Sequence, residues 1–404
     1  MNVSIIGQGY VGQSLAVAAA SAGHKVIGLD LNLDLINDLK NGDSFVPGID
    51  KKLLLKLITQ ELYLPTNNFD LLAETSVIVI AVPTPIDENR QPDLRALLEA
   101  CKSINTVVAE PTLVISESTS FPGTLRNIIK NSVETGSKTS FLFAISPERV
   151  DPGNKEWKIE NTPRVISGLT EQATKLAIEF YESFCSNIIK VSSPEIAEAA
   201  KLLENTFRQV NIALVNEFSE IMSKLGISAN EVVNAASSKP FGFMKFLPSI
   251  GVGGHCIPVD PEYLTYFAKS LGAYSKLTET ANILNLNRPK QVGNIIKDHL
   301  GTNFVGSQIQ IVGIAYKTGV SDMRESPAIE LISTLRGFGA KVKWHDPIVR
   351  NWKGEVSMPL DPDVNLGLIV TPHDEIDFSI WSKSGTKVLD LSVDSKDLGW
   401  QKIL

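Results

Sequence analysis

Hydrophobic and polar positions along the first half of the chain alternate between short apolar runs and longer stretches of helical spacing. The apolar runs are strand-length, and most are bounded by Gly, Pro, Asp or Ser, which favours buried strands entering turns. The predicted strands are Val3–Ile6, Lys25–Leu29, Val77–Val82, Thr112–Ser116, Phe141–Ile145 and Ile188–Val191. Because helical segments lie between them, we expect a doubly wound α/β domain with a parallel sheet over residues 1–193.

The pattern changes after Pro194. Glu195–Leu225 carries apolar residues at helical spacing without Pro or Gly and is followed by Gly226, which predicts one long helix. A second α/β block follows a mostly helical region, with predicted strands at Gln308–Val312, Lys341–Trp344, Leu366–Val370 and Lys387–Leu391. We therefore expect a Rossmann-type domain over 1–193, a central helical domain over 194–300 and a C-terminal Rossmann-like α/β domain over 301–404.

Composition narrows the class of protein. A chain of 404 residues exceeds what a single core supports, and 43% hydrophobic content argues against disorder. No apolar run reaches the ~20 residues that span a bilayer, and the N-terminus lacks a basic leader, so we expect no membrane segment and no signal peptide. A net charge of −7 argues against a nucleic-acid partner.

The cysteines and histidines indicate the cellular compartment, the reactivity of the thiols and whether a metal site is expected. Three cysteines are too few for a disulfide framework, so we expect a reducing cytoplasm. Cys101 and Cys185 lie in apolar helical surroundings and are expected to be buried, inert thiols. With only five histidines and no paired ligand spacing, we expect no metal site.

The turn Gly7-Gln8-Gly9-Tyr10-Val11-Gly12 follows a predicted strand and opens an Ala-rich helix. Its first glycine permits the tight turn, the second lets the backbone approach a pyrophosphate, and the third allows close helix–strand packing. Such turns also occur for packing alone. Asp30, however, ends the next predicted strand about 20 residues on, where a carboxylate would bind the ribose hydroxyls of NAD and repel the phosphate of NADP. The pair therefore predicts NAD binding.

The long predicted helix carries Lys201 and Asn205 as i,i+4 neighbours on one face, flanked by Glu204 and Arg208. This set has an ordinary interpretation as a solvated polar face with an internal Glu–Arg pair. It becomes a site only if a reactive group faces it.

The loop around Cys256 could supply that group. Gly251-Val252-Gly253-Gly254-His255-Cys256 offers a backbone that can wrap closely round a ligand and hold a thiol in an exposed turn. A thiolate attacks an aldehyde carbon, and a nearby cation such as Lys201 would lower its pKa. Asp260 is a candidate acid or base nearby in the sequence, while His255 is either a base or a loop hydrogen-bonder.

Three further loops follow predicted strands, at the sheet edge where ligands bind in open α/β folds. Thr119, in Ser116–Thr124, and Glu148, in Ser146–Arg149, are candidates to position a water. Their ordinary alternatives are a helix N-cap and a surface ion pair. The loop Val82-Pro83-Thr84-Pro85 is either part of the same site or a rigid turn.

Over nearly its whole length the chain resembles the UDP-glucose/GDP-mannose dehydrogenase family. The motifs that carry the resemblance occur in family order: GQGYVG, VPTP, ESTSFPGT, SPERVDPGN, KLLENTFRQVNIALVNE, KPFGFM, GVGGHCIPVDPEYL and AYKTGVSDMRESPA. SPERVDPGN, KPFGFM and GHCIPVDP are most similar to the UDP-N-acetylglucosamine 6-dehydrogenase type, which feeds polysaccharide precursor synthesis. Val259 stands where UDP-glucose enzymes usually carry Lys, which favours an N-acetylated sugar.

The resemblance implies an NAD-dependent four-electron oxidation of a sugar C6 alcohol to a carboxylate through a Cys256 thiohemiacetal and thioester. Lys201 and Asn205 would stabilise oxyanions, Asp260 would assist proton transfer, and Thr119 and Glu148 would act on the water. The implied catalytic residues are Cys256, Lys201, Asn205, Asp260, Thr119 and Glu148.

The resemblance also assigns the binding residues. The implied NAD-binding residues are Gly7, Gly9, Tyr10, Val11, Gly12, Asp30, Pro83, Thr84 and Thr119. The implied UDP-sugar-binding residues are Glu148, Arg149, Lys201, Asn205, Arg208, Gly253, Gly254, Lys317 and Arg324. The long helix is expected to join the lobes and to form a homodimer interface.

Two segments depart from the family pattern, and several functions stay open. Pro248-Ser249-Ile250-Gly251 replaces the more usual Pro-Gly-Pro-Gly, and Thr318 stands where a second Lys is common. UDP-glucose 6-dehydrogenation is the first alternative. A two-electron dehydrogenase of the 6-phosphogluconate or hydroxyacid type would have no role for Cys256, and a non-catalytic NAD- or sugar-nucleotide-binding protein would make no NADH.

Overall fold

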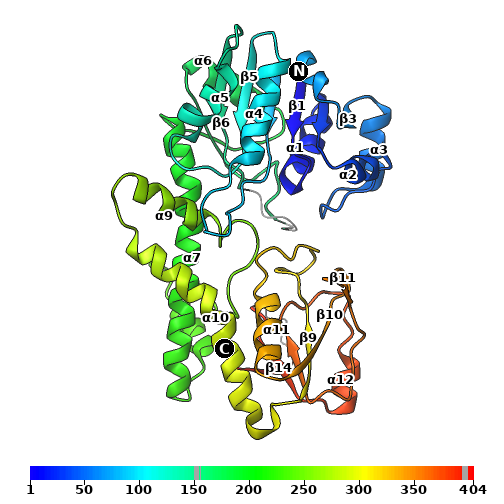
Figure 1. Cartoon of the computed structure of the whole chain (residues 1–404), viewed down its shortest axis with the longest axis vertical. Helices are drawn as coiled ribbons and strands as arrows, with labels where there is room; N and C mark the ends of the chain where they lie inside the picture. The colour runs from blue at the N-terminus through cyan, green and yellow to red at the C-terminus, as the bar shows by residue number, and fades with distance from the viewer. Residues whose placement is uncertain (150–153, 155, 394–398) are drawn as a thin grey trace. The chain divides into compact units, whose positions relative to one another are not determined.

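The computed structural model describes residues 1–149, 154, 156–393 and 399–404. It divides the chain into two compact units (Figure 1). Unit 1 comprises Met1–Glu204 and Tyr266–Gly272, and unit 2 comprises Asn205–Thr265 and Ala273–Leu404. Residues 150–153, the Val-Asp-Pro-Gly of the SPERVDPGN motif, lie outside the described residues.

Unit 1 is built on an eight-stranded sheet in the order β3-β2-β1-β4-β5-β6-β7-β8. The strands are β1 (Asn2–Ile6), β2 (Lys25–Leu29), β3 (Tyr63–Thr66), β4 (Val77–Ile80), β5 (Thr112–Ser116), β6 (Phe141–Ile145), β7 (Arg164–Gly168) and β8 (Ile188–Lys190). All neighbours from β3 to β6 pair in parallel, so the predicted doubly wound sheet is confirmed there.

The last two strands differ from the expected parallel sheet. β7 pairs antiparallel with β6, and β8 pairs in parallel with β7, so both run against the other strands. The connection from Ser146 to Pro163 forms no helix in its described part, and a parallel return would need a long crossover. The chain therefore turns back beside β6 without a crossover.

Helices cover both faces of this sheet, as alternating strand side chains require. The helices of unit 1 are α1 (Tyr10–Ser21), α2 (Leu33–Lys40), α3 (Lys51–Thr59), α4 (Arg95–Val107), α5 (Lys130–Glu134) and α6 (Glu171–Glu182). Short helical turns lie at Phe69–Glu74 and Leu125–Ile129. Residues of α1 and α6 share a buried cluster with Val3 and Ile5, whereas residues of α4 and α5 share another with Ile6.

The long helix α7 (Pro194–Lys224) confirms the predicted long helix and contributes residues to both units. It is followed by Gly226, whose φ of 67° suits a residue without a side chain. The later helices are α8 (Ala229–Ala236), α9 (Asp260–Ser270), α10 (Lys276–Leu300), α11 (Pro327–Gly337) and α12 (Ser379–Ser384), with a 3₁₀ turn at Gly301–Asn303.

Unit 2 contains a five-stranded sheet in the order β10-β9-β13-β14-β15, and every neighbouring pair is parallel. Its strands are β9 (Gln308–Val312), β10 (Lys341–His345), β13 (Leu366–Ile369), β14 (Val388–Asp390) and β15 (Gln401–Lys402). A separate hairpin is formed by β11 (Asn351–Trp352) and β12 (Glu355–Val356). Buried side chains of α10 and α11 pack with those of β9 around Trp344, so the expected second α/β domain is confirmed.

Buried polar side chains connect α7 and α10 within unit 2. The Gln209 amide donates to Asn282 at 3.0 Å, and the Asn285 amide donates to the Gln209 side chain at 3.1 Å. Arg288 donates to the Ser249 carbonyl at 3.0 Å, and the Ser249 N–H donates to Asn216 at 2.8 Å. Ser249, a departure from the family pattern, is thus fixed through its backbone just before the Cys256 loop.

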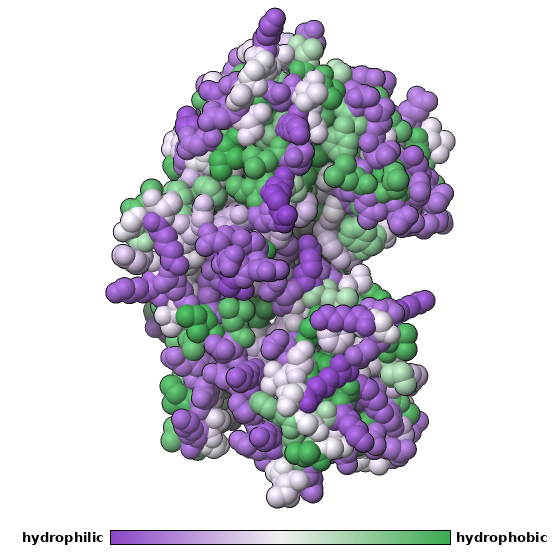
Figure 2. All heavy atoms as spheres, in the orientation of Figure 1, coloured by the Kyte–Doolittle hydropathy of each residue, from purple (hydrophilic) through white to green (hydrophobic). Residues whose placement is uncertain are grey.

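Among the described helices, none combines the length and hydrophobicity needed to cross a membrane. In the orientation of Figure 1, the visible surface of each unit is largely hydrophilic, with hydrophobic side chains in separate patches (Figure 2).

Candidate functional site

The glycine turn of unit 1 leads from β1 into α1. Gly7 has φ +94°, and a Cβ placed there would lie 2.5 Å from the Ala81 carbonyl oxygen. A Cβ on Gly12 would lie 1.7 Å from the Gly7 carbonyl oxygen, whereas a Cβ on Gly9 would meet no atom within 4 Å. Gly7 and Gly12 are therefore required by close packing, and Gly9 leaves open space above the turn.

Asp30 lies directly beside this turn at the end of β2. Its Oδ2 accepts from the Gln8 N–H at 2.7 Å, and its Oδ1 accepts from the Asn32 N–H at 2.9 Å. Tyr10 and Val11 form the half-buried first turn of α1. A helix N-terminus with open space above Gly9 suits a pyrophosphate, and a neighbouring carboxylate suits ribose hydroxyls, so these residues fit NAD.

Two more predicted loops lie at the carboxyl ends of β4 and β5, on the same edge of the sheet as this turn. Thr84 is buried and Pro83 is exposed in the first loop, while Thr119 is buried in the second. The Ser118 hydroxyl donates to the Val82 carbonyl at 2.8 Å and ties the two loops together. The loops predicted from sequence to lie at one sheet edge therefore do so in unit 1.

Beside Thr119 lies a buried ion pair that sequence reasoning missed. Glu117 follows β5, and its carboxylate accepts from Arg164 at 2.7 Å and from the Tyr181 hydroxyl at 2.5 Å. Both members of the Glu117–Arg164 pair are almost fully buried. Burial raises the pKa of Glu117, although the adjacent Arg164 opposes that shift, and the charge of Glu148 adds to it.

Glu148, the predicted water-activating residue, is connected to this pair. It is half-buried after β6, and its N–H donates to the Glu117 carbonyl at 3.4 Å. Arg164 also donates to the Ser146 hydroxyl at 3.2 Å, two residues before Glu148. The sequence signal for the Glu117–Arg164 pair was weak. Glu117 directly follows a predicted apolar strand, but Arg164 begins β7, a strand that was not predicted.

Lys201 is buried on α7, at 7% exposure, which excludes the solvated polar face as its setting. One turn earlier, the carboxylate of Glu198 accepts from the N–H groups of Gly123 at 2.6 Å and Leu125 at 2.9 Å. Burial raises the pKa of Glu198 to about 7, although these backbone hydrogen bonds oppose the shift. Sequence reasoning did not identify Glu198, which attaches α7 to the loop that bears Thr119.

Glu204 pairs with Arg149, at 2.6 Å between Oε1 and Nη2. Arg149 also donates to the Pro163 carbonyl at 2.9 Å. Arg149 therefore connects the segment that follows β6 to α7. Arg208 lies farther along α7 with its side chain exposed.

The three cysteines occupy different environments. Cys101 and Cys185 are buried, as predicted, and burial raises the pKa of Cys101 to about 12. Cys256 lies in an exposed position in unit 2. Only Cys256 among them is accessible to a substrate carbon.

The Cys256 loop is fixed to the start of α9. The Asp260 N–H donates to the Cys256 carbonyl at 2.8 Å, and the buried Asp260 carboxylate accepts from the Asn205 amide at 2.6 Å. The structure thus places Asn205 against Asp260, four residues after the thiol, although the two residues are far apart in sequence.

The same loop packs against the segment that follows β9. The Gly254 N–H donates to the Arg324 carbonyl at 3.0 Å. A Cβ on Gly253 would lie 2.8 Å from Tyr316 Cβ, and one on Gly254 would lie 2.9 Å from the Tyr316 ring. Glycine is therefore needed at both positions, where the Cys256 loop packs closely against the segment that carries Tyr316 in unit 2.

Lys317 is half-buried in that segment, next to Tyr316. The Arg324 guanidinium pairs with Asp322 at 2.6 Å, and its side chain is half exposed. No group of three or more His, Cys, Asp or Glu side chains suited to a metal ion occurs in the part of the chain that the structure describes.

Comparison with known proteins agrees with this geometry. Three domain profiles of the UDP-glucose/GDP-mannose dehydrogenase family match the chain: its NAD binding domain at residues 1–185, its central domain at 195–287 and its UDP binding domain at 310–390. The glycine turn and Asp30 lie in the first match, Cys256 and Asp260 in the second, and Lys317 and Arg324 in the third.

Individual relatives cover most of the chain. Protein CapL of Staphylococcus aureus is 36% identical, over 85% of this chain and 82% of its own. A UDP-N-acetyl-D-glucosamine 6-dehydrogenase of Salmonella typhi is 35% identical, over 86% and 83%. The solved structure of the UDP-D-ManNAc dehydrogenase of Pyrococcus horikoshii, 29% identical, superposes with a TM-score of 0.89 and covers 100% of this chain and 99% of its own. The chain therefore belongs to the UDP-glucose/GDP-mannose dehydrogenase family of NAD-dependent oxidoreductases.

Proposed function

We propose that this enzyme oxidises the C6 alcohol of a UDP-N-acetylhexosamine, UDP-N-acetylglucosamine or an epimer, to the uronate. The observation that carries the proposal is the exposed Cys256 thiol, in a glycine loop that is hydrogen-bonded to Arg324 and followed by the buried Asp260 carboxylate, which accepts from Asn205. Relatives named for UDP-N-acetylglucosamine and UDP-D-ManNAc support an N-acetylated sugar. Val259, in place of the lysine of UDP-glucose enzymes, supports it as well.

The proposed reaction removes four electrons in two oxidations. The C6 alcohol loses a hydride and a proton to give an aldehyde, and the Cys256 thiolate adds to the aldehyde carbon to form a thiohemiacetal. Loss of a second hydride gives a thioester, which water cleaves to the carboxylic acid with return of the thiolate. NAD, when bound at Gly7–Gly12 and Asp30, supplies the hydride acceptor, and two NAD are reduced for each sugar.

The proposed roles of the side chains follow from their chemistry. Asp260 exchanges protons with the substrate oxygen, and the hydrogen bond from Asn205 fixes its carboxylate. Lys201 stabilises oxyanionic intermediates as a cation, together with the Asn205 amide as a donor. Thr119 and Glu148 orient and activate the water that cleaves the thioester.

Substrate binding is proposed to use backbone groups of two glycines and cationic side chains. Gly253 and Gly254 are proposed to contact the sugar through their backbone, which packs so closely against Tyr316 that a side chain at either position would clash with it. Lys317 and Arg324 bind the UDP part, for which cationic donors suit the diphosphate. The remaining proposed contacts are Glu148, Arg149, Lys201, Asn205 and Arg208.

We also propose that α7 forms a homodimer interface. Phe207, Leu214 and Ile221 repeat every seven residues along the helix and are 44%, 61% and 52% exposed. Apolar side chains at this spacing share one helix face and are stabilised by burial against a second copy of the chain. A Leu214→Glu variant should sediment as a monomer where the wild type sediments as a dimer. An unchanged oligomeric state would reject this interface.

We propose that the chain has three functional domains. Residues 1–193 form the cofactor domain, residues 194–300 the central domain with the Cys256 loop, and residues 301–404 the UDP-sugar domain. Three cysteines are too few for a disulfide framework, which suits a reducing compartment, and we propose that the enzyme works in the cytoplasm.

NADH formation against a panel of UDP- and GDP-sugars tests the function. We expect two NADH for each UDP-N-acetylhexosamine and slow turnover of UDP-glucose. One NADH for each sugar would instead indicate a two-electron dehydrogenase of the hydroxyacid type. Binding of NAD and UDP-sugar without NADH would indicate a non-catalytic protein.

The thiol is tested by replacing it. Cys256→Ser should stall turnover after the first oxidation, because a hydroxyl is a far weaker nucleophile than a thiolate at neutral pH. Cys185→Ser, which changes a buried thiol in unit 1, is the matched control and should retain turnover. Full conversion to the uronate by Cys256→Ser would reject the nucleophile assignment.

A further inference from the structure

The loop Gly313–Gly319 follows β9 and carries Lys317 in its middle. β9 lies between β10 and β13 in the sheet of unit 2, at the point where the strand order reverses. The carboxyl ends of parallel strands at such a point form the usual ligand-binding edge of an open α/β sheet. The conformation of this loop therefore decides where Lys317 is presented.

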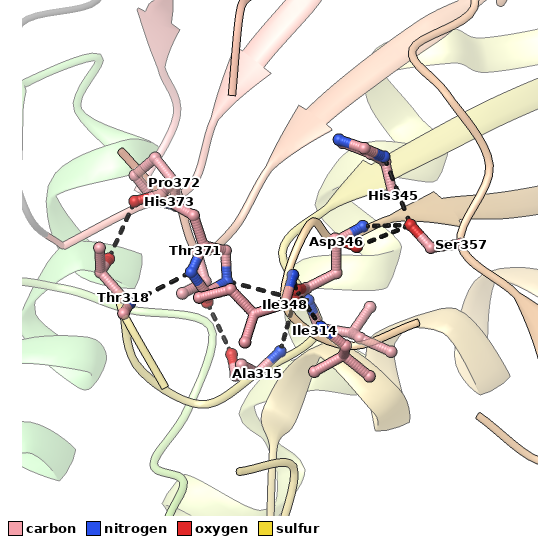
Figure 3. Close-up of polar contacts among 12 residues, drawn as sticks. Ile314, Ala315, Thr318, His345, Asp346, Ile348, Ser357, Thr371, Pro372 and His373 are labelled. Atoms are coloured by element: carbon pink, nitrogen blue, oxygen red, sulfur yellow. Dashed lines mark hydrogen bonds and ion pairs between the residues drawn. The ribbon is translucent and has the colours of Figure 1, made fainter. Parts of the chain in front are cut away.

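Asp346 holds the start of the loop. It follows β10, and its fully buried carboxylate accepts through Oδ2 from the N–H groups of Ile314 at 2.9 Å and Ala315 at 3.2 Å (Figure 3). Its Oδ1 accepts from the N–H groups of Ile348 at 3.0 Å and Val349 at 2.8 Å. Burial alone would raise the pKa of Asp346, but these hydrogen bonds and one from His373 lower it, so the carboxylate is ionised at neutral pH.

His373 holds the end of the same loop. It follows β13, is 3% exposed, and accepts at Nδ1 from the Gly319 N–H at 3.1 Å. Because Nδ1 accepts, the proton of the neutral imidazole lies on Nε2, which is 3.2 Å from Asp346 Oδ2 and donates to it. One imidazole thus connects Gly319 to the carboxylate that binds Ile314 and Ala315.

The strand-end segment Thr371–His373 makes further contacts with the loop. The Thr371 hydroxyl donates to the Ala315 carbonyl at 2.8 Å, and the Thr318 hydroxyl donates to the Pro372 carbonyl at 3.0 Å (Figure 3). A Cβ on Gly313 would lie 2.0 Å from the Thr371 carbonyl oxygen. Hydrogen bonds therefore fix the backbone on both sides of Lys317.

We propose that Asp346 and His373 are positioning residues for substrate binding, which hold the Gly313–Gly319 loop in the conformation that presents Lys317 to the UDP part of the substrate. The inference rests on the proposed role of Lys317 and deepens it. Neither side chain needs to touch the substrate, since each acts through the backbone of the loop. Thr318, where a second lysine is common in the family, acquires a role as one of the loop's attachment points.

Replacing His373 in three ways separates its two hydrogen bonds. His373→Gln keeps a donor near the position of Nε2 for Asp346, His373→Asn keeps an acceptor near the position of Nδ1 for Gly319, and His373→Ala removes both. His345 is the matched control, because its ring approaches Ser357 and not the loop (Figure 3). We expect His373→Ala to weaken UDP binding about tenfold, the Gln and Asn variants to weaken it less, and His345→Gln to leave it unchanged.

The readouts are calorimetric titrations of UDP and NAD, KM and kcat for the UDP-sugar, and amide hydrogen exchange of the loop. A positioning role predicts weaker UDP binding, a raised KM and faster exchange at residues 314–319, with NAD binding and kcat nearly unchanged. If His373→Ala does not fold, the same comparison is made with the Gln and Asn variants. Folded variants with wild-type UDP affinity would overturn the inference. A wild-type protein that binds no UDP would instead overturn the proposed function.

Discussion

Alanine substitutions at two glycines of the same turn should impair different properties: Gly12→Ala the stability of the fold, and Gly9→Ala the binding of NAD. A Cβ at Gly12 would lie 1.7 Å from the Gly7 carbonyl oxygen, and separating the two atoms to 3.0 Å requires a displacement of at least 1.3 Å. The obstructing atom belongs to the backbone, which cannot move aside by rotating a side chain. A Cβ at Gly9, by contrast, meets nothing within 4 Å. Its φ of −74° is open to any residue.

The expected magnitudes differ accordingly. Overpacking at a buried site costs about 1–3 kcal/mol, and the displacement at Gly12 places it at the upper end. For a unit of this size, about 3 kcal/mol corresponds to a fall in Tm of roughly 6–12 °C. Gly9→Ala should cost less than about 1 kcal/mol, as an Ala for Gly change at a helix N-cap. Its methyl group would occupy the space proposed for the pyrophosphate, so NAD affinity should fall at least ~10-fold.

Thermal unfolding and calorimetric titration with NAD check both variants. Gly337→Ala is the matched control, since it lies at the end of α11 with no atom within 4 Å of its Cβ. Gly12→Ala with wild-type Tm would refute the packing of the turn. Gly9→Ala with wild-type NAD affinity would refute the placement of the pyrophosphate.

Three further predictions concern buried charges. Arg164→Met should destabilise the protein by about 3–5 kcal/mol in urea unfolding, because Glu117 is left buried without its cation. Adding Glu117→Gln should recover part of this loss of stability. A loss of under about 1 kcal/mol would show that the ion pair contributes little to stability. Glu198, with its pKa raised to about 7, favours folding while protonated, so its stabilising contribution is present below pH ~4.5 and is lost as the pH rises through 7. Glu198→Gln should therefore gain up to about 3 kcal/mol relative to wild type between pH 5 and pH 8, and a pH-independent difference would contradict the raised pKa. Lys201→Ala should lower kcat ~100-fold or more and leave the NAD dissociation constant within ~2-fold, whereas loss of folding alone would assign Lys201 a structural role.

The strands predicted from sequence are those whose signal is local. Val77–Val82 and Thr112–Ser116 were predicted as buried apolar runs between breakers, and they contain β4 (Val77–Ile80) and β5 (Thr112–Ser116). β3 was missed because Pro65 lies inside it, and proline is tolerated there only because β3 is an edge strand. β7 was missed because it begins with Arg164, a residue that is buried only through its pairing with Glu117.

The candidate site also contains features with a local sequence signal and features that depend on the tertiary fold. The glycine turn and the Cys256 loop can be recognised in the sequence by their closely spaced glycines. In the structure, neighbouring atoms lie so close to several of these glycines that a side chain would clash. The contact of Asn205 with Asp260 depends on how α7 meets the start of α9, which no local pattern contains. Asp346 and His373 could not be paired from sequence, because their meeting depends on the order of three strands.

The reversal at β7 decides where the connection between β6 and β7 lies. A parallel strand would start at the opposite edge of the sheet. β7 instead starts beyond the carboxyl end of β6, because Ile145, the last residue of β6, pairs with Ser167 near the end of β7. Both ends of the connection between β6 and β7 therefore lie at the edge that carries Glu148 and Thr119. Because we propose that Glu148 and Arg149, at the start of this connection, contact the substrate, exchanges beside them are expected to alter substrate preference while the register of β6 and β7 stays intact.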